Sequence, residues 1–223
     1  MIKVVVVDDE TLVRSGIQMI LNSSEDLLVV ATADGPSAVE VVRRERPNVV
    51  LLDIRMPQVD GLAVLRQIQK MSDPPHVGML TTFDADEYVL TALRSGASGF
   101  LLKDTEPDEL IQLVRTLAAG GIVLSPRASC VLLRIKPETA ARQGAELARV
   151  RLLSKRERDV LVLIGEGFSN PEISALMYLG VGTVKDHVSS ILSKLRVSSR
   201  VQAVLVAERA GLLRKSAATG DPA

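Results

Sequence analysis

Aromatic residues, cysteines and long apolar runs are all scarce in this 223-residue sequence. With no tryptophan, two tyrosines and three phenylalanines, the chain has few rings for base stacking, which argues against a single-stranded nucleic-acid binder. The single cysteine, Cys130, cannot close an internal disulfide, and no Cys/His spacing typical of a metal site occurs, so we expect a reducing cytoplasm. No apolar run approaches the roughly 18 residues of a membrane-spanning helix, and we expect no membrane partner.

Charge is plentiful, and its two signs are unevenly distributed along the chain. The whole sequence holds 27 basic and 27 acidic residues, yet residues 1–125 contain 18 acids against 11 bases, and residues 126–223 contain 9 acids against 16 bases. This asymmetry indicates two domains with different partners: a cation for the acidic half and a polyanion for the basic half. The alternative is that solvated faces happen to differ in sign.

Short β-branched runs alternate with helical spacing in the front half. This pattern predicts a doubly wound α/β fold, in which a five-stranded parallel sheet carries helices on both faces, as in flavodoxin. We expect Thr105 to cap the last helix of this half, with Pro107 in its first turn. The expected strands are residues 2–7, 28–31, 49–52, 77–80 and 100–102, and the expected helices are residues 12–21, 37–46, 62–69, 84–94 and 105–119.

Polar side chains follow the predicted strands at their carboxyl ends, where ligands bind in such sheets. They are Asp8, Asp9, Glu10, Asp53, Thr81, Thr82 and Lys103. Carboxylates gathered there repel one another unless a cation lies among them, and a site made only of oxygen ligands favours Mg²⁺. A carboxylate beside Mg²⁺ can attack phosphorus, while a hydroxyl and a lysine hold the phosphoryl oxygens. The alternative is a set of helix caps and polar loop ends.

The basic half predicts a small all-α domain of four helices. Ser154 and Glu157 have the spacing of a capping box, and Asn170 is expected to cap the next helix, with Pro171 in its first turn. A glycine-containing turn then leads to residues 183–195, and residues 199–210 form the last helix. Two short helices joined this way indicate a helix-turn-helix whose second helix enters the DNA major groove. The alternative is a plain bundle that binds a protein.

Residues 1–120 resemble the receiver domain of two-component response regulators. The resemblance is carried by VVDDE at 6–10, LLDIRMP at 51–57, DG at 60–61, LTT at 80–82 and GASGFLLK at 96–103. It implies that Asp53 accepts a phosphoryl group from a sensor histidine kinase. It also implies a Mg²⁺ site formed by Asp8, Asp9, Asp53 and the backbone carbonyl of Arg55.

The same resemblance implies which residues change position when Asp53 is phosphorylated. Thr81 would be the hydroxyl drawn toward the phosphate, Lys103 would pair with the phosphate, and Phe100 would occupy the position of the rotating aromatic residue. Phosphorylation adds about −1.5 to −2 charges, so the loops that carry these residues would rearrange.

Residues 152–213 resemble the LuxR-type DNA-binding domain. The matching stretches are LSKRE at 153–157, GFSNPEI at 167–173, GTVKDHV at 182–188, ILSKL at 191–195 and SR at 199–200. With the receiver in front, the chain is similar to a NarL/FixJ-type response regulator. The resemblance implies a homodimer on double-stranded promoter DNA, with RNA polymerase a further partner. The implied DNA contacts are Thr183, Lys185, Asp186, Ser189, Lys194 and Arg200.

The remaining segments are expected to be a linker at 121–151, with a short helix at 127–133 and a mobile or helical tether at 136–149, and a flexible tail at 214–223. We interpret the chain as a phosphorylation-controlled transcription regulator and not an enzyme. One alternative is a regulator that uses the receiver only as a dimer or ligand platform. The other is an aspartyl-phosphate phosphohydrolase. Those enzymes use a second aspartate as general acid, and the loop Asp53-Ile54-Arg55 of this chain lacks it.

Overall fold

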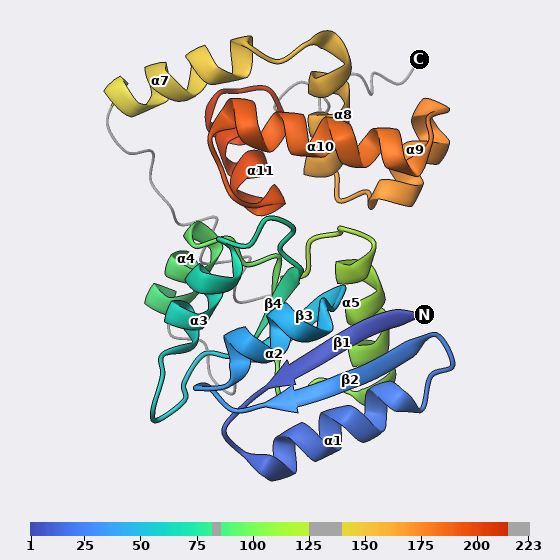
Figure 1. Cartoon of the computed structure of the whole chain (residues 1–223). Helices are drawn as coiled ribbons and strands as arrows, with labels where there is room; N and C mark the ends of the chain where they lie inside the picture. Colours follow the sequence, from blue (N-terminus) through green and yellow to red (C-terminus); the bar gives the residue numbers. More distant parts are fainter. Residues whose placement is uncertain (82–85, 125–139, 214–223) are drawn as a thin grey trace, which may run out of the picture. The chain divides into compact units, whose positions relative to one another are not determined.

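The computed structural model describes residues 1–81, 86–124 and 140–213 (Figure 1). The chain forms two compact units, Met1–Arg134 and Ile135–Ala223. Among the described residues, no helix combines the length and the apolar character that a bilayer span requires. The predicted helix at 127–133, Cys130 and the predicted tail lie outside the described residues.

The first unit is built around a five-stranded parallel sheet. Its strand order is β2-β1-β3-β4-β5. Strand β2 therefore lies on one side of β1, and β3, β4 and β5 follow on the other side. The strands are β1 (Ile2–Val7), β2 (Leu27–Ala33), β3 (Val49–Asp53), β4 (His76–Thr81) and β5 (Gly99–Leu102). All five residues of β3 are buried, which explains its continuous apolar run. The predicted doubly wound α/β fold is confirmed.

Helices cover both faces of this sheet (Figure 1). On one face, α1 (Thr11–Asn22) and α5 (Pro107–Ala118) pack together over the strands through Leu21, Val114 and Leu117. The other helices of the unit, which contact one another in succession, are α2 (Ala38–Glu45), α3 (Gly61–Ile68) and α4 (Asp86–Arg94). Helices therefore cover both faces of the sheet, and a ligand would bind at the ends of the strands.

The start of α5 corrects one expectation. Its N-cap residue is Glu106, not Thr105, because Pro107 occupies a first-turn position. The Thr105 hydroxyl instead donates a hydrogen bond to the Leu102 carbonyl at 2.7 Å. Thr105 therefore closes the loop after β5 and does not cap the helix.

The second unit is entirely helical in the part that the structure describes. Its helices are α7 (Ala140–Arg151), α8 (Lys155–Gly165), α9 (Asn170–Met177), α10 (Val181–Leu195) and α11 (Arg200–Arg209). The predicted capping box of Ser154 and Glu157 is present. The predicted Asn170 cap is wrong: Ser169 is the N-cap residue, and its backbone N–H donates to Glu172 at 2.7 Å. Helix α10 begins at Val181, two residues before the predicted start.

Helix α7 belongs to this helical unit, although the sequence predicts a linker there. Val150 is buried in the core that α8, α9, α10 and α11 form. Arg149 donates to the carbonyl oxygen of Leu195 at 3.0 Å, and buried Glu146 accepts from Arg209 at 2.9 Å. The four predicted helices are therefore joined by a packed fifth helix, and of the two alternatives for the tether, mobile or helical, the structure has the helical one from residue 140 onward.

Candidate functional site

Two buried carboxylates lie at the carboxyl ends of β1 and β3. Asp8 is fully buried and Asp53 is 4% exposed, while neighbouring Asp9 is exposed. One carboxylate oxygen from each of these three residues lies within 4.8 Å of the other two. The parallel strands bring residues 45 positions apart to one rim, as the sequence predicts.

Lys103 joins the two buried acids. Its ammonium Nζ lies 2.7 Å from Asp8 Oδ2 and 3.0 Å from Asp53 Oδ2. The loop after β5 places it there, because the Lys103 backbone N–H donates to the carbonyl of Thr81 at 2.9 Å. The lysine expected to hold a phosphate thus already lies against the predicted acceptor.

The environment changes the proton affinity of both partners. Burial raises the pKa of the Asp53 carboxyl, and the charge of Asp8 raises it further, although the hydrogen bond from Lys103 opposes both. Burial alone would lower the pKa of Lys103, but hydrogen bonds to Asp8 and Asp53 raise it overall. Lys103 therefore stays charged, and its hydrogen bond limits the rise in the pKa of Asp53.

A cavity of about 620 Å³ opens beside these carboxylates. Asp9, Glu10 and Arg55 line one part of it, and Tyr88 of α4 lies across from them with its ring centroid 5.3 Å from the Arg55 guanidinium carbon. The Arg55 backbone N–H points at Asp53 Oδ1, 3.4 Å away. The opening therefore lies next to Asp53, whose chain neighbours Ile54 and Arg55 line it.

The two predicted switch residues are both buried. Thr81 is 7% exposed at the end of β4, and Phe100 is 1% exposed in β5 beside Met79. The structure brings Thr81 to the same rim as Lys103 through the backbone hydrogen bond between them. Thr82 lies outside the described residues.

Helix α10 presents most of the predicted DNA contacts on one face. Val184, Ile191 and Leu195 point into the core of the helical unit. The exposed residues of its first half are Val181, Gly182, Thr183, Lys185, Asp186 and Ser189. Four predicted contacts (Thr183, Lys185, Asp186 and Ser189) therefore lie on the exposed face of the candidate recognition helix.

The other two predicted contacts have partners inside the protein. Arg200 is 8% exposed and donates to Asn170 Oδ1 at 2.8 Å and to the carbonyl oxygen of Phe168. Burial lowers the pKa of this guanidinium to about 10, which leaves it charged at neutral pH. Arg200 is thus a structural residue that ties α11 to the start of α9, and its guanidinium does not face solvent.

Lys194 pairs with Glu157, a residue that the sequence identifies only as part of a cap. Lys194 Nζ lies 2.7 Å from both Glu157 carboxylate oxygens, and the Ser190 hydroxyl donates to Glu157 Oε1 at 2.6 Å. Ser190 and Lys194 are four residues apart, so both reach α8 from the same face of α10. That spacing, with a buried glutamate at the start of α8, fixes the position of the candidate recognition helix.

These features define a class of signalling protein in which an α/β domain with clustered carboxylates is joined to a helix-turn-helix domain. The family model "Response regulator receiver domain" matches residues 4–115, and "Bacterial regulatory proteins, luxR family" matches residues 151–207. The chain therefore belongs to the response regulators that carry a LuxR-type DNA-binding domain.

The sequences of individual relatives match this chain over nearly its whole length. Transcriptional regulatory protein LnrK of Bacillus subtilis (strain 168) is 38% identical over 95% of this chain and 99% of its own, and DegU of Brevibacillus brevis is 34% identical over 96% and 95%. Among solved structures, the crystal structure of ChrA, a response regulator of a heme-sensing two-component system, matches with a TM-score of 0.51. The match covers 95% of this chain and 98% of the ChrA chain, with 33% sequence identity. LnrK and DegU are both named as transcriptional regulatory proteins.

Proposed function

We propose that Asp53 receives a phosphoryl group from a sensor histidine kinase in the cytoplasm and that this modification controls promoter binding by α10. The observation that carries the proposal is the buried Asp8–Lys103–Asp53 arrangement beside an open cavity. In the transfer, an Asp53 oxygen attacks the phosphorus, the phosphorus–nitrogen bond of the donor histidine breaks, and the imidazole keeps the electron pair.

The donor set at this rim fits Mg²⁺. Asp8, Asp9 and Asp53 supply three carboxylates within 4.8 Å of one another, and we include the backbone carbonyl of Arg55 as a fourth ligand. Hard oxygen ligands, only a few of which come from the protein, suit an ion that retains water. When bound, the ion would offset the negative charge that gathers as a phosphoryl donor approaches.

The chain's own residues would then convert phosphorylation into movement. Lys103 is already 3.0 Å from Asp53 and would shift from the carboxylate to the new phosphoryl oxygens. The Thr81 hydroxyl would follow the same oxygens, and the end of β4 would move with it. Phe100 would change its packing in β5, and α4 would move in turn. We propose that this rearrangement favours a homodimer, with RNA polymerase as a later partner on the promoter.

The receiver and the DNA-binding domain would correspond to residues 1–120 and 152–213. We propose that Thr183, Lys185, Asp186 and Ser189 contact the major groove, because they form the exposed face of α10. The Lys194 side chain is 38% exposed, and any contact to a DNA phosphate would be made while its ion pair with Glu157 is kept. Asp53 would take up one phosphoryl group per signal, since the loop carries no second aspartate to promote turnover.

Substitution Lys185→Ala should weaken DNA binding about tenfold, because a lysine contact to a base edge or phosphate is worth about 1–3 kcal/mol. The measurement is a binding isotherm on a duplex that the wild-type protein enriches from a random-sequence pool. Lys3→Ala is the control, since it removes the same charge from an exposed position in β1. Equal affinity of the two variants would exclude Lys185 from the interface. Phosphoryl uptake should be unchanged in both.

A further inference from the structure

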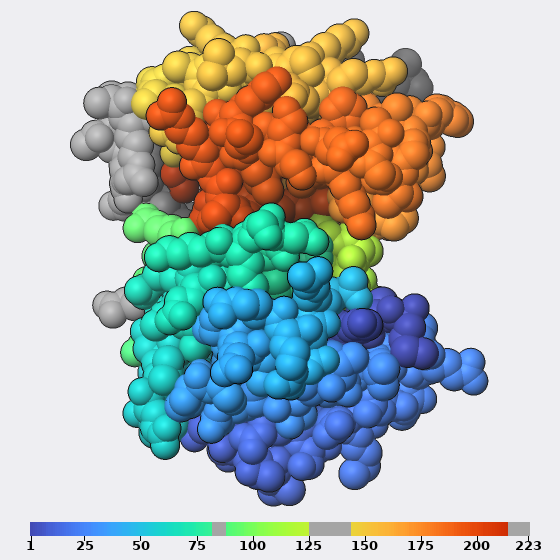
Figure 2. Space-filling model, in the orientation of Figure 1, coloured from blue at the N-terminus to red at the C-terminus, as the bar shows by residue number. Residues whose placement is uncertain are grey.

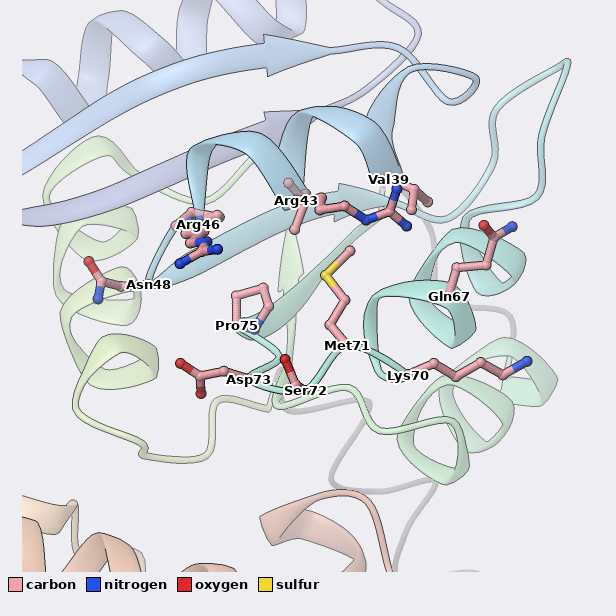
Figure 3. A pocket seen from close by; sticks show the side chains of 12 residues that line it. Val39, Arg43, Arg46, Asn48, Gln67, Lys70, Met71, Ser72, Asp73 and Pro75 are labelled. Carbon is pink, nitrogen blue, oxygen red and sulfur yellow. The ribbon is translucent and has the colours of Figure 1, made fainter.

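A second cavity lies in the receiver unit, away from the carboxylate rim. It is about 720 Å³ in volume and opens between the end of α2, the end of α3 and the segment that enters β4 (Figure 3). Pro47 and Asn48 precede β3, and Pro75 precedes β4, so the cavity lies at the amino ends of these strands. Asp53 lies at the opposite, carboxyl end of β3, which separates the two sites. Figure 2 shows the light-blue surface of α2 beside the teal surface of α3.

The lining of this cavity is basic, although its domain is acidic. Arg43, Arg46 and Lys70 line it against a single carboxylate, Asp73. Arg43 and Arg46 lie on the α2 side, and Lys70 lies on the α3 side (Figure 3). Three of the 11 bases in residues 1–125 are thus gathered here, in a segment with 18 acids.

These three cations have no side-chain partner in the part of the chain that the structure describes. No hydrogen bond or ion pair engages the side chains of Arg43, Arg46 or Lys70 there, whereas neighbouring Arg44 pairs with Glu45 at 2.7 Å. The carbonyl ends of α2 and α3 contribute roughly half a negative charge each. Together with Asp73 they leave about one positive charge unmatched, and because all three cations are exposed this charge is accessible to an anion from solvent.

Apolar side chains form the remaining wall. Met71 and Pro75 lie between the basic residues, and buried Val42 contributes from α2 (Figure 3). A thioether and a proline ring offer a surface on which an aromatic ring can lie, and methionine sulfur favours such contacts. The volume is within the range of roughly 300–1,000 Å³ that is usual for small-molecule sites.

We propose that this cavity binds a nucleoside phosphate, with its phosphates on Arg43, Arg46 and Lys70 and its base against Met71 and Pro75. Arginine side chains match phosphate oxygens in geometry and charge, and the apolar wall gives a planar base a place that an inorganic anion would leave empty. The site is separate from Asp53 and would supply the receiver with an input independent of phosphorylation.

The test is a calorimetric titration of the full-length protein with ADP in the presence of EDTA, so that no metal ion can bridge the nucleotide to the acidic rim. We expect saturable binding at one site, weakened at least about tenfold in the double substitution Arg43→Gln, Lys70→Gln, because each lost charge-assisted contact is worth about a factor of ten or more. Arg44→Gln is the matched control and should bind ADP as the wild type does. Asp53→Asn should also bind ADP normally, which separates this proposal from the proposed phosphorylation.

Further ligands identify which part of the nucleotide is recognised. Pyrophosphate and adenosine should each bind at least about tenfold more weakly than ADP, because each makes only one of the two sets of contacts. No saturable heat with ADP would overturn the proposal. Equal affinity of ADP and pyrophosphate would also overturn it, since the apolar wall would then have no role. A double variant that melts earlier but binds ADP normally would overturn it too, because the cations would then serve only the helix ends.

Discussion

Substitution Gly61→Ala should destabilise the receiver domain by about 3 kcal/mol and slow phosphoryl uptake. A Cβ atom at this position would lie 2.1 Å from the carbonyl oxygen of Asp53 and 2.9 Å from that of Ile54. Both atoms belong to the backbone, so no side-chain rotation can relieve the overlap. The backbone of Asp53, the proposed phosphoacceptor, would have to move together with its carboxylate.

Gly16→Ala provides the matched control for this substitution. Gly16 lies within α1, and a Cβ atom there would meet nothing within 4 Å. Alanine in a helix interior is more stable than glycine by about 0.5–1 kcal/mol, so this variant should be slightly stabilised. Hydrogen exchange of β1 and β3 measures the stability, and intact mass after timed exposure to a phosphodonor measures the uptake. A Gly61→Ala protein that matches the wild type in both would contradict the packing around Asp53.

Substitution Glu157→Ala should destabilise the helical domain by about 3 kcal/mol. Glu157 is 5% exposed and satisfies the backbone N–H of Ser154, the Ser190 hydroxyl and Lys194 at once. The Lys194 side chain is 38% exposed and can be hydrated after the change, which keeps the loss at the lower end of the range for a broken buried pair. Hydrogen exchange in α8 and α10 should accelerate by about a hundredfold or more.

Glu166→Ala is the control, because Glu166 is exposed at the end of the same helix. It should leave the exchange rates within a factor of about two of the wild type. Equal acceleration in the two variants would show that Glu157 does not hold α10 in place.

The same carboxylate should make the stability of the helical domain depend on pH. Burial alone would raise the pKa of Glu157, but hydrogen bonds from Lys194, Ser190 and Ser154 outweigh it and lower the pKa from 4.5 to about 2. Because the folded-state pKa is the lower one, the stabilisation is complete above pH 4.5 and is lost as the pH falls toward 2. Glu157→Gln should lose less stability than the wild type over this interval, and an identical pH profile would contradict the assignment.

The architecture of both domains could be predicted because local patterns and tertiary packing agree. The buried run of β3 and the acids that follow it are recognisable in the sequence, and parallel strands necessarily bring Asp8 and Asp53 to one rim. Helix starts are harder to predict, since Thr105 and Asn170 are good capping residues whose side chains make other hydrogen bonds, one within the loop after β5 and one to Arg200 in α11. The sequence predicts only a mobile or helical tether where α7 packs, because an Ala, Glu and Arg composition does not reveal that Glu146 and Arg149 bond to other helices.

The candidate DNA contacts show where sequence reasoning reaches its limit. A basic residue near a recognition helix suggests a phosphate contact, but its position along the helix does not show whether an internal partner already holds it. Lys194 has such a partner in Glu157, 37 positions away, and Arg200 has one in Asn170, 30 positions away. Lys185 lies on the exposed face of α10, and no pattern in the sequence distinguishes it from the other two.

The central claim is that Asp53 is the phosphoacceptor, and the intact mass of the protein tests it most directly. Wild type and the Asp53→Asn variant are incubated with Mg²⁺ and a small phosphodonor, and their masses are compared. We predict a gain of one phosphoryl group, about 80 Da, in the wild type alone, because only there is the carboxylate nucleophile present. A wild type that gains no mass, or an Asp53→Asn variant that gains as much as the wild type, would contradict the account.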